Sequence, residues 1–282
     1  ELPTTLKVCA DPNNLPMSNE TKGGYENEIA QLLSRELGIP ISYTWFPQRL
    51  GFVRNTLKKP SANGNGFLCD LIISVNSLTD LVLPTIPYMR STWAVVFLKD
   101  GRLNFIKTSK DIENLNFFDL PGLRIGIWDR GPSATFALKA GFMEKAKVYK
   151  TMQGDWRVSP GQILREELES GKVDAMFIWG PIGGYYQRSS ESKKVTVIPM
   201  RNIPGVQFEF DISMGVRRSD KKWKHKIDEL IVSEKNEIAR ILTAYGVPLL
   251  RKNRKISKNR KISKISAISR ETGFLELFSR SR

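Results

Sequence analysis

A strand, a polar loop and an amphipathic helix follow one another between Leu6 and Leu37, and this order leaves few folds open to the chain. Leu6–Ala10 has the composition of a buried strand. The helix that follows carries apolar residues at 29, 32, 33 and 37, which is the one-face spacing of a 3.6-residue period. Because ligands of open α/β sheets bind beyond the carboxyl ends of the strands, the Asp-, Asn- and Pro-rich loop is expected to border a cleft.

The same alternation of strand and helix continues along the chain. Strands at 41–46 and 71–75 complete a parallel βαβ arrangement, and the strand at 92–98 is expected to leave this first unit. The strand at 123–128 starts a second α/β unit, and further strands follow at 148–152, 173–179 and 195–200. The strand at 208–216 is expected to cross back, and 221–245 is expected to be one long helix. The sequence therefore predicts a two-lobed α/β fold, with 1–95 and 212–250 in one lobe and 96–211 in the other.

The charge of the chain is unevenly distributed. The net charge is +15 over 282 residues, but residues 251–282 alone hold eleven Lys and Arg against two Glu. Within this basic tail the hexapeptide NRKISK occurs twice in succession, at 253–258 and 259–264. Low complexity of this kind predicts a disordered arm, which suits an acidic partner better than specific nucleic-acid recognition. Binding of nucleic acid or a membrane surface through the tail is the weakest alternative.

Two further features concern the compartment. No apolar run is long enough for a transmembrane helix, and the chain begins at Glu1, which favours an exported protein whose signal peptide has been removed. In an oxidising compartment Cys9 and Cys69 would form a disulfide. If their strands are parallel neighbours, however, the Cα atoms can lie beyond the bridging limit of about 7 Å. Both a disulfide and two buried thiols remain open.

Nothing in the sequence indicates catalysis. The single histidine, His225, lies on a basic helix face and is expected to be solvated. One His and two distant Cys provide no ligand set for zinc or haem. Motifs of nucleophilic hydrolases, metalloproteases and nucleotide-binding loops are missing from the sequence. We interpret the chain as a non-enzymatic protein without a metal or cofactor.

Four segments in collinear order resemble the type II periplasmic solute-binding proteins that take polar amino acids: LKVCADPNNLPMSNETKGGYENEIAQLLSRELG, LCDLIISV, IPYMRSTWAVVFL and GKVDAMFIWGPIGGYY. The resemblance spans about residues 4–250 and implies two lobes joined by a hinge. Amino-acid binders of this family carry an Arg after the third strand and an acidic residue near the position of Trp179. Here 77–85 contains no Arg, and Trp179-Gly180 replaces the acidic residue. An ordinary amino acid would lose charge-assisted hydrogen bonds worth roughly 1.5–3 kcal/mol each.

Six shorter segments resemble the MoxJ/XoxJ family, the solute-binding-like proteins of methanol dehydrogenase operons: CADPNNLPMSN, YTWFPQRLGFVRNTL, YMRSTW, WGPIGGYY, FEFDISMGVRR and AYGVPLL. This resemblance implies a periplasmic accessory of a PQQ-dependent methanol dehydrogenase that aids maturation or activation through protein–protein contact. The alternative is the substrate-binding protein of an ABC transporter for a small polar ligand other than an ordinary amino acid.

Candidate contacts to a ligand or partner lie where strands end or helices begin. The guanidinium of Arg90 is the best remaining anion contact, and a helix start near 133 offers free backbone N–H groups. Each candidate also has a structural alternative, such as a turn, a capping serine, a surface arginine or an aromatic core residue. The candidates are Asp11, Asn13, Asn14, Trp45, Arg49, Tyr88, Arg90, Ser133, Thr135, Trp179 and Tyr185.

Overall fold

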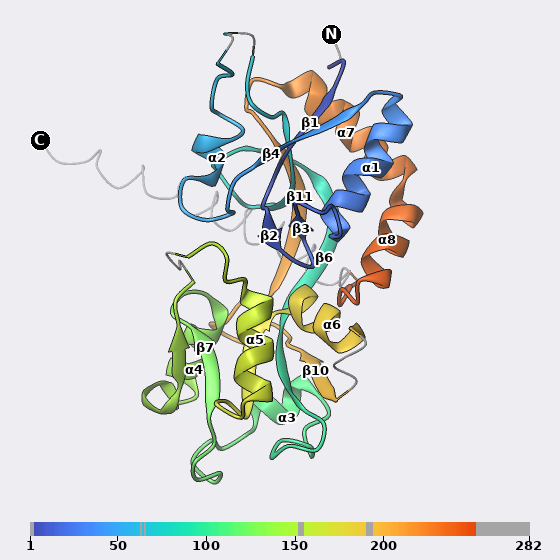
Figure 1. Ribbon diagram of the computed structural model, residues 1–282. Coiled ribbons are helices and arrows are strands. Elements are labelled where there is room, and N and C mark those ends of the chain that lie inside the picture. Colours follow the sequence, from blue (N-terminus) through green and yellow to red (C-terminus); the bar gives the residue numbers. More distant parts are fainter. Residues whose placement is uncertain (1–2, 63, 65, 152–154, 190–193, 252–282) are drawn as a thin grey trace, which may run out of the picture. The chain divides into compact units, whose positions relative to one another are not determined.

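The computed structural model describes residues 3–62, 64, 66–151, 155–189 and 194–251 (Figure 1). Residues 1–250 form one compact unit and 251–282 a second. The tail that the sequence predicts to be disordered lies outside the described residues beyond Arg251. Within the described part of the chain, no helix has both the length and the apolar character needed to cross a membrane.

A mixed sheet of nine strands runs through the compact unit in the order β4-β1-β5-β11-β6-β9-β7-β8, with β10 paired to β6. The neighbours β4, β1 and β5 are parallel, as are β9, β7 and β8, which confirms the two predicted α/β units. The strands are β1 (Leu6–Ala10), β4 (Ile41–Trp45), β5 (Leu71–Asn76), β6 (Leu83–Leu98), β7 (Ile125–Trp128), β8 (Lys147–Tyr149), β9 (Ala175–Trp179), β10 (Val195–Pro199) and β11 (Glu209–Val216).

The two long strands β6 and β11 connect the halves of the sheet. The first part of β6 pairs with β11, and from Trp93 onward β6 pairs with β9 and β10 instead. This change of partners lies close to the expected boundary after residue 95. Below, lobe 1 denotes the β4-β1-β5-β11 side with its helices, and lobe 2 the β9-β7-β8 side; the exact division of residues remains a prediction.

The strand β6 begins earlier than the predicted start at Thr92. Pro84 and Pro87 lie inside it, although proline normally ends a strand because it cannot donate a ladder hydrogen bond. Their partners on β11 are Gly215 and Ser213, and the register shifts on both sides of Ser213. These irregularities accommodate both prolines.

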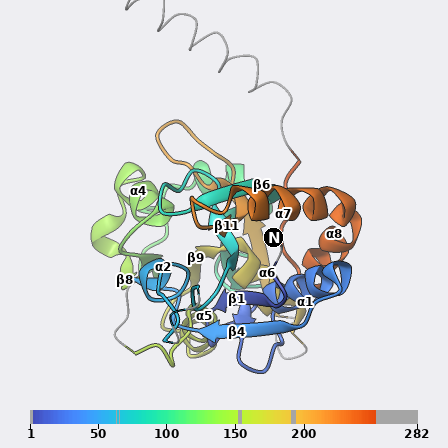
Figure 2. The ribbon, with the colours of Figure 1, turned by 90° about the horizontal axis from the view of Figure 1, so that it is seen from above.

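Eight helices of the described chain cover the sheet: α1 (Tyr25–Leu37), α2 (Phe52–Asn55), α3 (Ser109–Glu113), α4 (Pro132–Lys139), α5 (Pro160–Glu169), α6 (Gly180–Arg188), α7 (Lys221–Ser233) and α8 (Lys235–Ala244). In lobe 1, α1 and α8 lie together on one flank and α2 lies on the opposite flank (Figures 1 and 2). The prediction of a single helix over 221–245 is wrong. The chain bends at Glu234, so that α7 packs on β6 and β11 while α8 packs on α1.

Three groups of buried apolar side chains form the core. The largest extends from β1, β5 and α1 of lobe 1 to β9, α5 and α6 of lobe 2. A second fills lobe 2 around Phe136, Phe177 and Phe208. A third, smaller group lies beneath α2 and contains Cys9 and Cys69.

The two cysteines form a disulfide, with Cα atoms 5.4 Å apart. Their strands are indeed parallel neighbours, β1 and β5. Cys69, however, lies before β5 begins at Leu71, where the chain approaches β1 and the N–H of Asp70 donates to the carbonyl of Lys7. The geometric argument against a bridge therefore fails at this position.

Candidate functional site

A cleft of about 230 Å³ lies between the lobes. Its walls come from the loop after β1, the segment after β4, the ends of β7 and β9, and the start of α5. Of the predicted site residues, this cleft brings together Asp11, Asn13, Asn14, Arg49 and Trp179. The predicted contacts did not include the other polar and aromatic residues of its lining, which are Gln48, Trp128, Lys150, Thr151 and Ser159.

Asp11 organises the loops of lobe 1 at the cleft. Its carboxylate accepts the backbone N–H of Asn13 at 2.8 Å and that of Gln48 at 2.6 Å. Its own N–H donates to the hydroxyl of Ser18, which donates back to the Asp11 carbonyl. The turn-forming alternative for Asp11 thus describes its contacts well, because both carboxylate oxygens hold backbone in place.

Asn13 and Arg49 reach across the cleft to lobe 2. The side-chain amide of Asn13 donates to the carbonyl of Arg157 at 2.7 Å. The guanidinium of Arg49 donates to the carbonyls of Asp155 at 3.0 Å and Val158 at 3.4 Å. Two candidate ligand contacts are therefore used to join the lobes.

Trp128 lines the cleft and carries a buried polar atom that has no partner in the described part of the chain. The side chain is 5 % exposed, and its indole Nε1 makes no hydrogen bond with a described residue. An N–H left without an acceptor in a buried position costs free energy. The sequence could have indicated Trp128 as a cleft residue, because it ends the predicted strand 123–128 and the carboxyl ends of strands face the cleft of an α/β sheet.

The aromatic candidates separate into different environments. Trp179 lines the cleft and packs edge-on against Phe210, with ring centres 6.2 Å apart. Tyr185 lines another cavity, of about 580 Å³ between α5 and α6, and stacks on Tyr245. Trp45 stacks on Tyr43, with ring centres 4.7 Å apart, and packs against the main core. These contacts agree with the alternative that Trp45 is an aromatic core residue.

Arg90 and Tyr88 are engaged by neighbouring strands. Arg90 donates to Glu209 at 2.9 Å and to Asp211 at 3.1 Å, both on β11. Burial lowers the pKa of Arg90, but the hydrogen bonds and negative charges of the two carboxylates outweigh this effect and raise the pKa above its usual value. The hydroxyl of Tyr88 lies 2.7 Å from that of Ser74 on β5. The anion that Arg90 contacts in this structure is thus the protein's own.

The two candidates at the start of α4 differ from each other. Gly131 occupies the N-cap position, so the expectation of Ser133 as N-cap is wrong. Ser133 is the second residue of α4 and is fully buried. Its hydroxyl accepts the backbone N–H of Trp128 at 3.1 Å. Thr135 is exposed and donates to the carbonyl of Gly131. Ser133 therefore positions Trp128.

Glu26 is a buried carboxyl group at the first turn of α1. It is 4 % exposed, and its Oε1 has no hydrogen-bond partner among the described residues. Burial raises its pKa to about 7, Asp11 adds to the rise, and a hydrogen bond with Ser74 partly offsets it. This carboxyl group therefore titrates near neutral pH.

No group of three or more His, Cys, Asp or Glu side chains in the described ranges is arranged to hold a metal ion. The lining of the cleft combines two cations, Arg49 and Lys150, and one carboxylate, Asp11, with amide, hydroxyl, aromatic and aliphatic side chains. Such an arrangement can bind an acceptor group or a protein segment.

Comparisons with known proteins identify close relatives. No family model matches the chain. The protein MoxJ of Paracoccus denitrificans is 26% identical over 261 residues, which cover 88% of this chain and 90% of MoxJ. The crystal structure of the periplasmic binding protein XoxJ from Methylobacterium extorquens AM1 is 30% identical, covers 88% of this chain and 100% of XoxJ, and superposes with a TM-score of 0.68.

A further solved structure supports the fold. MxaJ from Methlophaga aminisulfidivorans MPT has a TM-score of 0.70 and 23% identity, and the match covers 87% of this chain and 100% of MxaJ. At that identity the likeness concerns the fold alone, which is the predicted two-lobed type II binding-protein fold. The match to XoxJ, at 30% identity over its whole length, shows that this chain belongs to the MoxJ/XoxJ family of periplasmic-binding-protein-like proteins.

Proposed function

We propose that this protein is a non-catalytic accessory of a PQQ-dependent methanol dehydrogenase, which it helps to mature or activate by direct contact in the periplasm. Membership in the MoxJ/XoxJ family supports the association with methanol oxidation. The disulfide between Cys9 and Cys69 suits the oxidising periplasm. The binding-protein fold then serves as a scaffold for a protein partner.

The observation that carries the proposal is that the chain's own side chains join the lobes across the cleft. Asn13 and Arg49 of lobe 1 bond to four backbone carbonyls of the 155–158 segment. A transport protein needs these positions for its solute, because closure around a ligand is what its hinge motion achieves. Here the same donors bond to the chain's own backbone on the other side of the cleft.

The groups that would hold an amino acid are also otherwise engaged. Arg90 is paired with two carboxylates of β11, and Trp179 stands in the position of the family's acidic contact. A zwitterion in this cleft would find Arg49 bonded to the carbonyls of Asp155 and Val158, and its ammonium would meet Asp11, whose oxygens already accept two backbone N–H groups. These contacts favour a protein partner over an amino acid.

The test uses purified components. The immobilised protein is exposed to a PQQ-dependent methanol dehydrogenase from the same organism, with and without PQQ, and the dissociation constant is measured. Binding at about 10 μM or tighter is expected, which corresponds to roughly 7 kcal/mol. In parallel, the rate at which the dehydrogenase gains methanol oxidation activity is expected to rise when the protein is added.

The matched control is an amino-acid-binding protein of the same fold, which should neither bind the dehydrogenase nor speed its activation. If the two proteins bind the dehydrogenase with the same affinity and change its rate of activation to the same extent, the accessory role is contradicted. Methanol oxidation by the protein alone would contradict its assignment as non-catalytic.

A second candidate function is the binding of a small ligand for a membrane transporter. The observation that favours it is the buried indole N–H of Trp128, which lines the cleft without an acceptor among the described residues. Such a ligand would carry a carbonyl or carboxylate oxygen. Unfolding and refolding the protein to release bound molecules, then adding them back, tests this: a ligand at a hundredfold excess over its dissociation constant stabilises the fold by about 2.7 kcal/mol.

A further inference from the structure

A second concave surface adjoins the cleft and is lined in part by α2. This helix lies on one flank of lobe 1 (Figure 1). This α2 groove has a volume of about 540 Å³ and runs between the 48–58 segment and the end of β5 with the chain that follows it. Gln48 and Arg49 line both the α2 groove and the cleft. The two surfaces therefore adjoin, but most of the groove belongs to lobe 1 alone.

The lining of the α2 groove is largely apolar. Its floor contains Phe52, Ile72 and Val82, which are buried members of the core group beneath α2. Its edges carry two leucines that face solvent, Leu50 at 87 % and Leu81 at 58 % exposure. Single exposed leucines are common, but two on the edges of one apolar groove are typical of a surface that a partner covers.

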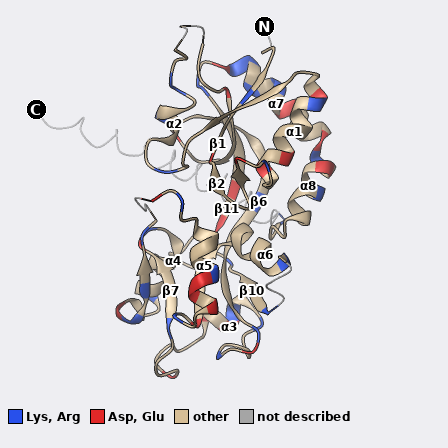
Figure 3. Ribbon diagram, in the orientation of Figure 1, with Lys and Arg blue, Asp and Glu red and all other residues tan. Residues whose placement is uncertain are grey.

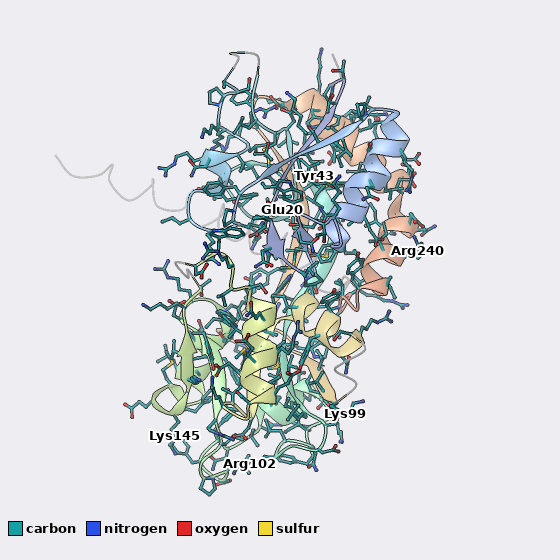
Figure 4. The ribbon with its side chains drawn as sticks, viewed as in Figure 1. Glu20, Tyr43, Lys99, Arg102, Lys145 and Arg240 are labelled. Atoms are coloured by element: carbon teal, nitrogen blue, oxygen red, sulfur yellow. A yellow bond between two sulfur atoms is a disulfide. The ribbon has the colours of Figure 1, made fainter. Side chains whose placement is uncertain are left out.

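The charged residues of the α2 groove are all basic. Arg49, Arg54 and Lys58 line it, and no Asp or Glu occurs among its described lining residues. Arg54 and Lys58 are exposed and pair with no described carboxylate. On α1, α7 and α8, by contrast, basic and acidic segments lie side by side (Figure 3). The cations Lys99, Arg102 and Lys145 lie at the end of lobe 2 away from lobe 1 (Figure 4), so the groove cations form a separate group.

We infer that the α2 groove docks a segment of a partner protein in which apolar side chains alternate with Asp or Glu. The apolar floor would take the apolar side chains, and the basic edge would pair with the carboxylates. The inference rests on the proposed function for the identity of the partner, the methanol dehydrogenase. The chain's own residues 251–282 are a poor occupant, because their eleven basic and two acidic residues would meet three cations.

The experiment measures binding of the full chain to two probes. The first is the dehydrogenase, and the second is a fluorescein-labelled synthetic peptide of alternating Leu and Glu. The variants are L50S with L81S, which removes the exposed apolar edges, and R54E with K58E, which reverses the charge. Both pairs alter exposed side chains, so the fold is kept. Each pair is expected to weaken binding of both probes by about tenfold or more, as for residues central to an interface.

Two controls match the variants in chemistry but lie outside the groove. L138S changes a leucine of lobe 2 that is 65 % exposed, and K221E with K222E reverses two exposed charges on α7. These should change either affinity by less than about twofold, the level of a surface residue outside an interface. A peptide with Lys in place of Glu should bind more weakly than the acidic one, and added salt should reduce that difference.

The outcomes separate the two proposals. If the dehydrogenase binds equally well to the wild type and to both groove variants, the groove inference is wrong while the accessory role stands. If the acidic peptide binds in a groove-dependent way but the dehydrogenase does not bind at all, the groove inference stands and the proposed partner is wrong. A dimer of this chain that dissociates in L50S with L81S would assign the groove to a second copy and overturn the inference.

Discussion

Glu26 shows how one residue can limit stability in this protein. A carboxyl group placed at the first turn of a helix normally benefits from the helix dipole. Here the side chain is almost fully buried, its Oε1 has no partner among described residues, and Tyr25 beside it is equally buried. Removal from water outweighs the dipole and raises the pKa of Glu26 to about 7.

Stability is therefore expected to fall as the pH rises. Between about pH 4.5 and 7 the unfolded chain has released this proton while the folded chain keeps it, so the folded state binds more protons and loses stability with increasing pH. The shift corresponds to roughly 3 kcal/mol by the free energy of one pKa unit. Replacing Glu26 with Gln should remove most of this dependence and stabilise the protein at pH 8 by about 1–3 kcal/mol.

Urea unfolding at pH 5 and at pH 8 checks this prediction. Glu36→Gln is the matched control, since Glu36 is exposed in the same helix and should leave the pH dependence of the wild type unchanged. A wild-type protein and an E26Q variant with the same difference in unfolding free energy between the two pH values would contradict the role of Glu26.

Among the elements, α6 holds the lobes together on the side of the C-terminal segment. A Cβ atom on Gly184 would lie 1.8 Å from the carbonyl oxygen of Gly246, so only glycine permits this approach of the two backbones. Beside this contact, Tyr185 stacks on Tyr245, and Arg188 donates to the carbonyl of Ala244 at 3.1 Å. The helix from lobe 2 thus contacts the chain that follows α8 of lobe 1.

The substitution Gly184→Ala is expected to destabilise the protein by about 2–4 kcal/mol, because backbone on both sides must move to admit a methyl group. Thermal and urea unfolding give the measurement. Gly161→Ala in α5 is the comparison, since its Cβ would meet only ordinary contacts of 3.5 Å and beyond. Equal stability of the two variants would show that the Gly184–Gly246 approach is not required.

At the scale of the molecule, the lobes are connected by strands, by core and by hydrogen bonds across the cleft. The strands β6 and β11 connect the two sides of the sheet, and the main hydrophobic core includes residues from both. Asn13 and Arg49 complete the closure on the cleft side. Such a molecule is expected to remain closed in solution without a ligand.

Small-angle X-ray scattering tests this expectation. The wild-type protein should give the same radius of gyration with and without added periplasmic metabolites. Replacing Asn13 and Arg49 with Ala removes the four hydrogen bonds to the 155–158 segment, worth about 1 kcal/mol each, and should raise the radius of gyration by populating an open form. Asn116→Ala removes a side chain bonded to Asp119 far from the cleft and should have no such effect. A wild type that contracts on addition of metabolites would support the transporter alternative instead.

Periodicity alone determined the main architecture of this protein. The parallel β4-β1-β5 unit, the second unit in lobe 2 and the returning strand β11 follow from local patterns of apolar residues, because each strand and helix must bury one face. The patterns also brought Asp11, Asn13 and Trp179 to the cleft, since the carboxyl ends of neighbouring strands meet at one edge.

Only the tertiary structure decided what these side chains contact. The bend at Glu234 arises because α7 and α8 pack on different elements, and the disulfide depends on how the chain enters β5. The pairing of Arg90 with β11, the reach of Asn13 to Arg157 and the burial of Glu26 likewise depend on contacts between segments distant in sequence. Local sequence sets which face a residue occupies, whereas its partners and the water it loses are set by the assembled fold.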